Sequence, residues 1–212
     1  MSAPSTPLIQ IMLRSAGKLS AFVLLSILLL LGIKSLTDPV ITEAEQQTLQ
    51  TLLDQVMPSE YYDNQPMKDT LTITQTPWLE SLGATSPVTI YRARKNGNPA
   101  GLVLPAIAPN GYSGNIYLLV GVLSDGRIAG VRVLKHKETP GLGDKIEAEK
   151  SPWIMEFDGR NLRDNNDPRW AVKKDGGDFD QFTGATITPR AVVQAVKRTL
   201  QLVNEHGDKL YE

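Results

Sequence analysis

The sequence predicts an α+β protein in which a single transmembrane helix precedes one domain with an antiparallel sheet and flanking helices. Three observations support this. An almost wholly apolar run covers residues 19–36 near the N-terminus. Apolar segments joined by Asn-Gly and Asp-Gly steps, which are typical of tight hairpin turns, occupy the middle of the chain. A segment with helical apolar spacing ends it, and helices on either side of such a sheet indicate the α+β class.

The composition excludes several classes of function. Lys and Arg total 22 and Asp and Glu total 23, so no basic excess indicates a nucleic-acid partner. The chain has no cysteine, which excludes disulfides, thiolate nucleophiles and cysteine-bound iron–sulfur clusters. Its two histidines make a histidine-rich metal or haem site unexpected, and we expect no metal ligands. If the protein carries electrons, the carrier is therefore organic, and a flavin meets that condition.

The apolar run at residues 19–36 approaches the length that a transmembrane helix needs. Arg14 and Lys18 precede the run, and acidic residues follow it. The positive-inside rule then predicts a cytoplasmic N-terminus, residues 1–18, with everything after the span outside. A cleaved signal peptide is the alternative. The length of the run, and the lack of a small-x-small cleavage site in residues 34–39, favour a retained anchor.

Residues 37–87 are predicted to be a helical linker and the start of the outer domain. Thr42 to Glu45 match a capping box, and an apolar stripe at helical spacing follows and stops before Pro58. Leu71 and Ile73 alternate with threonines and indicate a short strand. Residues 61–68 and 77–87 are predicted to be connections.

The remaining residues, 88–212, are predicted to form the main domain. Strands are expected at residues 88–94 and 102–104, on either side of the Asn96-Gly97 step. A second pair is expected at 116–123 and 128–134, on either side of Asp125-Gly126. Paired strands with two tight turns predict the antiparallel sheet.

The final helix is preceded by a stretch of small hydroxyl residues. Gly184 permits a tight turn, and Thr188 followed by Pro189 is a favourable N-cap and first helical residue. An amphipathic helix follows, with apolar residues at Val192, Val196, Leu200 and Val203. A helix N-terminus attracts anions such as phosphate, although such a stretch is by itself also typical of an ordinary cap.

Three motifs carry a resemblance to a known family. Residues 180–186, Asp-Gln-Phe-Thr-Gly-Ala-Thr, resemble the flavinylation motif Asp-x-x-Ser/Thr-Gly-Ala-Thr, in which the last threonine carries FMN through a phosphoester bond. Residues 111–114, Gly-Tyr-Ser-Gly, and 138–143, Glu-Thr-Pro-Gly-Leu-Gly, precede it in the same order as in that family. The region from Tyr91 to the C-terminus is therefore similar to the FMN-binding domain of two ion-pumping respiratory complexes. These are the Rnf electron-transport complex, in its G subunit, and the sodium-translocating NADH:quinone reductase, in its C subunit.

The resemblance implies which residues hold the cofactor. The carried-over attachment residue is Thr186, as a covalent phosphoester to FMN. Further contacts are expected from Thr183, Gly184, Ala185, Asp180, Thr188, Glu138, Thr139, Gly141, Leu142, Gly143, Tyr112 and Ser113. Lysines 135, 137 and 145 are possible sources of positive charge for the phosphate. No neighbouring group activates the Thr186 hydroxyl, so it is expected to be the acceptor for a separate flavin transferase that uses FAD and Mg²⁺.

The resemblance also implies a function. Such a chain is an electron-carrying subunit of an inner-membrane complex, not a complete enzyme. Complexes of this type couple electron transfer, typically between ferredoxin and NAD, to pumping of Na⁺ or H⁺. The expected partners are the other membrane subunits, the flavin transferase and, through one span, the lipid bilayer, with the main domain in the periplasm. A flavin-binding membrane regulator without pumping activity, and a structural periplasmic domain with an unmodified Thr186, remain as alternatives.

Overall fold

The computed structural model describes residues 8–212, and within this range it leaves out the side chains of residue 8 and of residues 40–46. The chain divides into two compact units, one up to Leu49 and one from Gln50 to Glu212. The helix α1, Leu8–Val56, contributes to both. The second unit contains the sheet and the three motifs that carry the family resemblance.

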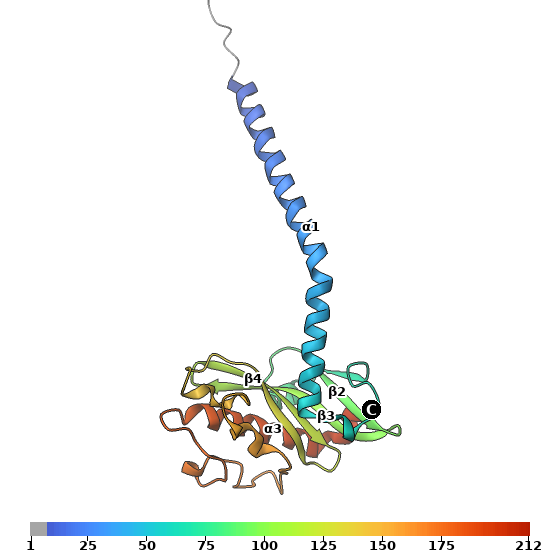
Figure 1. The fold of residues 1–212 in the computed structure, drawn as a ribbon, viewed down its shortest axis with the longest axis vertical. Helices are drawn as coiled ribbons and strands as arrows, with labels where there is room; N and C mark the ends of the chain where they lie inside the picture. The colour runs from blue at the N-terminus through green and yellow to red at the C-terminus, as the bar shows by residue number, and fades with distance from the viewer. Residues whose placement is uncertain (1–7) are drawn as a thin grey trace, which may run out of the picture. The chain divides into compact units, whose positions relative to one another are not determined.

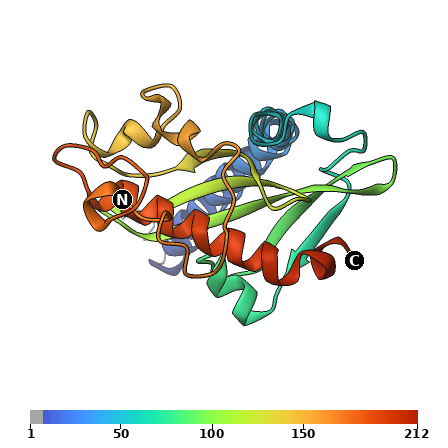
Figure 2. The same ribbon diagram turned by 90° about the horizontal axis from the view of Figure 1, so that it is seen from below.

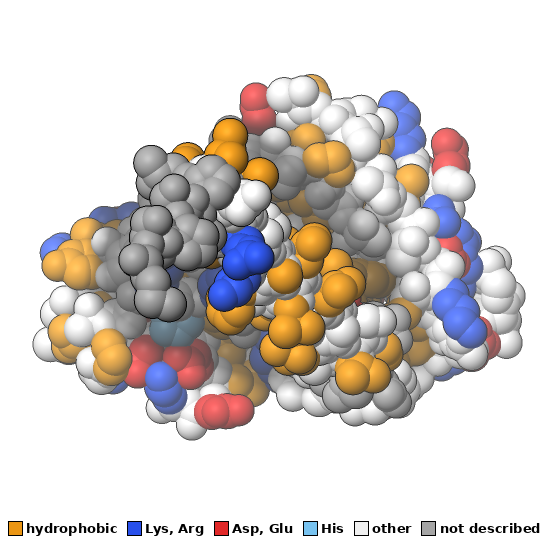
Figure 3. Space-filling model, turned by 90° about the horizontal axis from the view of Figure 1, so that it is seen from above, with side chains coloured by type: hydrophobic (Ala, Val, Ile, Leu, Met, Phe, Trp, Pro, Cys, Tyr) orange, Lys and Arg blue, Asp and Glu red, His pale blue; other side chains and the backbone are white. Residues whose placement is uncertain are grey.

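The first unit consists of the greater part of α1. Its stretch Ile9–Pro39 is long and apolar enough to cross a membrane, and its apolar side chains are exposed (Figure 3). The sequence predicted a new helix start at Thr42, which is wrong because α1 is continuous through this position, with Pro39 inside it. Residues 40–56 contain no glycine or proline that would interrupt a helix after Pro39. The predicted capping box lies outside the described side chains. The predicted end before Pro58 is confirmed.

The second unit is built on a five-stranded antiparallel sheet (Figure 1). Its strands, in the order β1-β2-β3-β4-β5 across the sheet, are β1 Thr70–Ile73, β2 Val88–Lys95, β3 Asn98–Gly111, β4 Gly114–Leu123 and β5 Ile128–Lys135. Both predicted hairpins are confirmed. Asn96 and Gly97 have φ of 51° and 76°, as a two-residue turn of the type I′ class requires. The 111–114 motif is a third hairpin turn, joining β3 to β4 through the pair Gly111 and Gly114.

Helix α3, Ile187–Tyr211, lies across one face of the sheet (Figure 2). The predicted apolar stripe is confirmed, because Val192, Val196 and Leu200 are fully buried against the strands. The predicted connection at 77–87 contains a short helix instead, α2 Thr76–Ser81, which packs on α3. Pro77 occupies its first turn, where a missing N–H costs nothing.

On the opposite face, the C-terminal end of α1 is seated on two paired glycines. Gly121 of β4 and Gly130 of β5 are register partners. A Cβ added to Gly121 would lie 2.0 Å from the Val56 carbonyl oxygen, and one added to Gly130 would lie 2.9 Å from Val56 Cα. Because glycine lacks Cβ, the helix backbone approaches the sheet directly, and Val56 is fully buried. We call this arrangement of Val56 on Gly121 and Gly130 the glycine seat.

Short 3₁₀ helices connect the rest of the unit: η1 Ser59–Tyr61, η2 Gly143–Ile146, η3 Pro152–Phe157 and η4 Lys173–Asp175. The segment from η2 to η4 carried no interpretable motif, yet it supplies most of an aromatic cluster. Phe157 stacks on Phe179 with ring centroids 4.5 Å apart, and Trp153 meets Phe182 edge-on at 5.1 Å. The cluster closes the core beside the first turn of α3 and fixes the start of the Asp180–Thr186 motif.

Candidate functional site

The site is organised around the first turn of α3. Thr186 is the N-cap residue, with φ of −70° and ψ of −28°, and its side chain makes no capping hydrogen bond. The sequence predicted Thr188 as the N-cap and Pro189 as the first helical residue, and this is wrong. The helix begins at Ile187, so Thr188 lies inside its first turn. The Thr186 hydroxyl, on a half-buried residue, therefore keeps its hydrogen-bonding capacity.

The Thr188 hydroxyl is used elsewhere, which is the physical reason why it does not cap the helix. It donates a hydrogen bond to Oε2 of Glu138, and Thr188 is fully buried. At a cap the hydroxyl oxygen would accept a hydrogen bond from a neutral backbone N–H, whereas the hydrogen bond that Thr188 donates to the charged carboxylate is the stronger of the two. The first-turn N–H groups, which have no partner inside the helix, remain available there, except that Pro189 has none.

Glu138 joins two of the sequence motifs to the first turn of α3. Its Oε1 accepts a hydrogen bond of 2.9 Å from the Ser113 N–H in the 111–114 turn, while its Oε2 accepts the Thr188 hydroxyl. Glu138 itself belongs to the 138–143 motif and is only 5% exposed. Gly143 makes this packing possible, because a Cβ there would lie 2.9 Å from both Glu138 Cβ and Thr188 Oγ1. Three segments distant in the sequence are thereby held together by one carboxylate.

The loop after Gly143 is fixed by an ion pair between a buried carboxylate and an exposed lysine. The Asp144 carboxylate, 4% exposed, lies 2.9 Å from the Lys150 ammonium. The hydrogen bond from Lys150 holds the pKa of Asp144 below its ordinary value. Lys150 also contacts Glu147 at 2.8 Å and, together with His136, lowers the pKa of that carboxyl. The position of the 138–143 motif is thus set from both of its ends.

A pocket of about 540 Å³ opens between these three motifs and the start of α3. This volume is within the range typical of cofactor and small-ligand sites. Nine predicted residues line it: Tyr112, Glu138, Thr139, Leu142, Gly143, Gly184, Ala185, Thr186 and Thr188. Tyr112 and Leu142 stay 68% and 42% exposed, so they offer apolar surface to a ligand. The sequence reasoning missed Ile187, which also lines the pocket and is 45% exposed. The only indication in the sequence was that Ile187 directly follows the motif at residues 180–186.

Four predicted contacts do not line the pocket. Ser113 contributes its N–H to Glu138, as described above. Asp180 is exposed and pairs with Lys173 at 2.5 Å, while its carbonyl accepts the Trp153 indole N–H at 2.8 Å. Thr183 is exposed on the motif loop. Gly141, with φ of 78°, supplies the turn that brings Leu142 and Gly143 inward.

The charge around the pocket differs from the expectation. None of the three lysines at positions 135, 137 and 145 lines it, and its one charged lining residue is Glu138. Positive potential for an anion in this pocket therefore comes from the helix N-terminus of α3 and its free amides. Gly184, with φ of 81°, turns the backbone tightly just ahead of Thr186.

Comparisons with known proteins agree with this geometry. Residues 111–201 match the sequence model of the FMN-binding domain, and residues 1–56 match that of the RnfG N-terminal region. The G subunit of the ion-translocating oxidoreductase complex from Pseudomonas aeruginosa UCBPP-PA14 is 48% identical over 199 residues, covering 94% of this chain and 92% of the relative. The corresponding protein of Photorhabdus laumondii is 48% identical over 206 residues, covering 96% and 97%. That of Pseudoalteromonas atlantica is 54% identical over 154 residues, covering 73% and 70%.

The FMN-binding match includes all three motifs and the pocket between them, and the N-terminal match includes the apolar helix. The chain therefore belongs to the family of G subunits of ion-translocating oxidoreductase complexes.

Proposed function

We propose that the chain carries FMN as a phosphoester on Thr186 and relays electrons within a membrane-bound oxidoreductase complex. The observation that carries this proposal is the position of Thr186. Its hydroxyl is free of a capping role, lines the pocket and stands at the N-terminus of α3. A phosphate ester at that point is favoured by the free amides and by the helix dipole, a contribution of about 0.3–1 kcal/mol.

The pocket fits the remainder of a flavin mononucleotide. Tyr112, Leu142 and Ile187 present exposed apolar surface suited to a flat aromatic ring system. Glu138 orients two of the surrounding segments through Ser113 and Thr188. When bound, the flavin supplies the ability to accept two electrons together and release them one at a time.

Attachment is the work of a separate transferase, because no histidine adjoins Thr186 in the sequence to activate its hydroxyl. The Thr186 oxygen replaces AMP on the FMN phosphorus of FAD, so one phosphoanhydride bond breaks, one phosphoester bond forms and the hydroxyl proton leaves. Asp180 and Thr183 are exposed on the same loop and are available for recognition by that enzyme.

The chain is anchored in the bacterial inner membrane by the apolar part of α1. With Arg14 and Lys18 ahead of the span, the N-terminus faces the cytoplasm and the flavin domain the periplasm. The relay serves a complex that couples electron transfer between ferredoxin and NAD to Na⁺ or H⁺ translocation. The relatives compared above are complex subunits, which favours this role over that of a regulator.

The test is flavin retention after denaturation. The full-length chain is expressed in a host that contains the flavin transferase and is resolved by denaturing electrophoresis. We expect a fluorescent band whose flavin maps to Thr186 in the peptide mass spectrum, and complete loss of both signals in Thr186→Ala. Thr72→Ala, at an exposed threonine of β1 outside the motif, is the matched control and keeps full labelling. A wild-type band without flavin, or a labelled Thr186→Ala chain, would contradict the assignment.

A further inference from the structure

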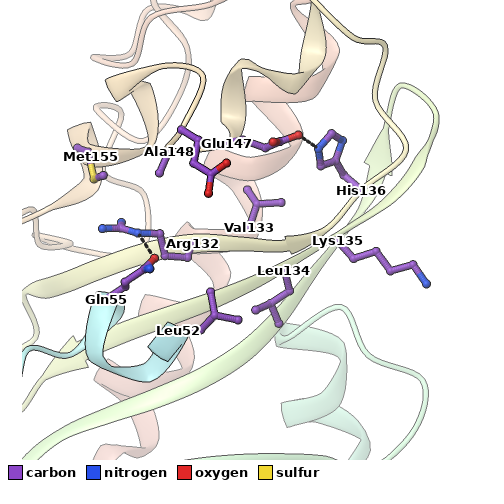
Figure 4. A pocket seen from close by; sticks show the side chains of 11 residues that line it. Leu52, Gln55, Arg132, Val133, Leu134, Lys135, His136, Glu147, Ala148 and Met155 are labelled. Carbon is purple, nitrogen blue, oxygen red and sulfur yellow. Dashed lines mark hydrogen bonds and ion pairs between the residues drawn. The ribbon is translucent and has the colours of Figure 1, made fainter. Parts of the chain in front are cut away.

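A second hollow, of about 600 Å³, lies in the same unit but shares no residue with the flavin pocket (Figure 4). Its base is five consecutive residues, 132–136, at and just beyond the end of β5. The end of α1 forms one wall, through Leu52 and Gln55, and the segment after η2 forms the other. We call this hollow the β5 groove.

The β5 groove lies at an open strand edge. Successive strand residues point to opposite faces of a sheet, so a hollow lined by several in succession must wrap around the edge. Among the described residues β5 pairs only with β4. Its outer edge is bonded near its start, where Ile128 pairs with Gly159 and Arg160. Farther along, the Val131 carbonyl accepts Nη1 of its neighbour Arg132 at 2.8 Å.

Beyond that point the edge carries unpaired peptide groups. In an antiparallel ladder the outward-facing residues alternate, so the N–H and C=O of Val133 face outward as those of Val131 do. No hydrogen bond to these Val133 groups is present within the described part of the chain. An exposed edge of this kind is a template for an added strand, with the flanking side chains supplying selectivity.

The charges of the β5 groove favour an acidic occupant. Arg132 bonds Gln55 Oε1 at 3.2 Å, and neither it nor Lys135 has a carboxylate within ion-pair distance in the described structure. Lys135 points away from the other lining side chains (Figure 4). On the opposite wall, Glu147 is already held by His136 and Lys150. Arg132 thus lies within the groove, and Lys135 on its outer side, each without an ion pair in the described structure, and Glu149 is the one other carboxylate among the lining residues.

We infer that the β5 groove binds an extended, acidic segment of another subunit of the complex, added as a strand along the edge of β5 with a carboxylate facing Arg132. The partner class rests on the proposed function. Docking there would place the partner close to the flavin pocket, because His136 lines the groove and its Nδ1 accepts the Glu138 N–H at 2.9 Å. Glu138 in turn lines the flavin pocket.

The test uses the intact complex, extracted from membranes through a tag on this chain. Arg132→Glu places a like charge against the acidic segment, and we expect about a tenfold loss of co-purified subunits. Arg127→Glu, at an exposed arginine of the β4–β5 turn, is the matched control and retains them. Covalent flavin fluorescence of the chain stays unchanged in both variants. Full co-purification of Arg132→Glu would overturn the inference.

A second measurement detects the contact directly. A photo-crosslinking amino acid replaces Val133, with Asn96 in the β2–β3 turn as the control position. We expect an adduct with another subunit at Val133 only. An adduct of twice the chain's mass would identify a second copy, and no adduct would leave the groove without a macromolecular partner. Either result overturns the inference, whereas loss of wild-type flavin would bear only on the proposed function.

Discussion

The end of α1 and the start of α3 meet the same sheet in opposite ways. At the glycine seat, the backbone of Val56 touches Gly121 and Gly130 with no room for one added carbon atom. At the start of α3, Thr186 keeps its hydroxyl out of the helix cap and faces a pocket of about 540 Å³. The end of α1 is tightly packed and contributes stability. The start of α3, which we call the open end, faces a pocket and contributes a binding site. Substitutions at the two ends are therefore expected to separate stability from flavin binding.

The largest effect on stability is expected at the glycine seat. In Gly121→Ala, the new Cβ would collide with a backbone oxygen, which cannot rotate away, so the helix end must be displaced. We expect a loss of about 3 kcal/mol in the free energy of unfolding, at the upper end of typical overpacking costs. Urea unfolding of the full-length chain in detergent, followed by tryptophan fluorescence, measures it.

Gly207→Ala is the matched control for the glycine seat. Gly207 lies inside α3, and a Cβ there would meet only Val203 Cγ1, at an ordinary 4.0 Å. Alanine is the better helix former, so the free energy of unfolding should rise by about 0.5–1 kcal/mol. Equal losses in the two variants would show that the seat has no special role.

A smaller effect on stability is expected at Thr188, whose hydrogen bond to Glu138 holds the start of α3 in place. Thr188→Val keeps the shape of the side chain but removes a hydroxyl from the buried carboxylate of Glu138. Hydrogen bonds to charged groups are worth about 1.5–3 kcal/mol, and we expect a loss of about 2 kcal/mol together with reduced flavin labelling. Thr199→Val is the control, because this equally buried hydroxyl only donates to Ala195 O in the same helix. Similar flavin labelling of both variants would show that the hydrogen bond between Thr188 and Glu138 does not hold the site in place.

The two helix ends also show what sequence reasoning can reach. The hairpin turns, the apolar stripe of α3 and the turn at Gly184 are local patterns, and they were predicted correctly. The choice of N-cap was not, because it depends on Glu138, which is 50 residues away in the sequence. The motifs nonetheless identified nine residues of the pocket, since their resemblance carries long-range information that spacing alone lacks.

The glycine seat and the aromatic cluster could not be predicted from local sequence patterns, because both consist of contacts between segments that are distant in the sequence. Gly121 and Gly130 sit inside strands, where a glycine signals only a close approach by some unspecified neighbour. Trp153 and Phe182 come from segments without periodicity, and their contact is visible only in three dimensions. Short helices such as α2 escape prediction because six residues give too few repeats for a pattern.

A pH-dependent contribution to stability is expected along the body of α3. The loop beside α3 holds Asp167, 2% exposed, whose hydrogen bonds from Arg169 keep the pKa of this carboxyl well below its usual range. The Asp167 carbonyl also accepts Lys197 Nζ of α3 at 3.2 Å. A carboxyl with a depressed pKa stabilises the fold above its unfolded pKa, and this stability is lost as the pH falls through the acid range.

Asp167→Asn should therefore lower stability by about 1.5 kcal/mol at pH 7, with the difference from wild type shrinking below about pH 4. Unfolding curves at several pH values measure this. The exposed Asp208, on α3, is the control position, and Asp208→Asn should change stability by less than about 0.5 kcal/mol. A difference that does not depend on pH would show that the Asp167 charge is irrelevant.

The smallest effect on stability is expected for Leu142, whose apolar side chain lines the flavin pocket beside the start of α3. Leu142 is 42% exposed, so Leu142→Ala should change the free energy of unfolding by less than about 0.5 kcal/mol. The same truncation removes cover from the flavin pocket, and we expect iodide to quench the bound flavin more strongly. Leu134→Ala, on β5 and 40% exposed, removes an equal amount of side chain outside the pocket and should leave quenching unchanged. Equal quenching in both variants would mean that Leu142 does not cover the flavin, and the open end would then be defined by Thr186 and the helix N-terminus alone.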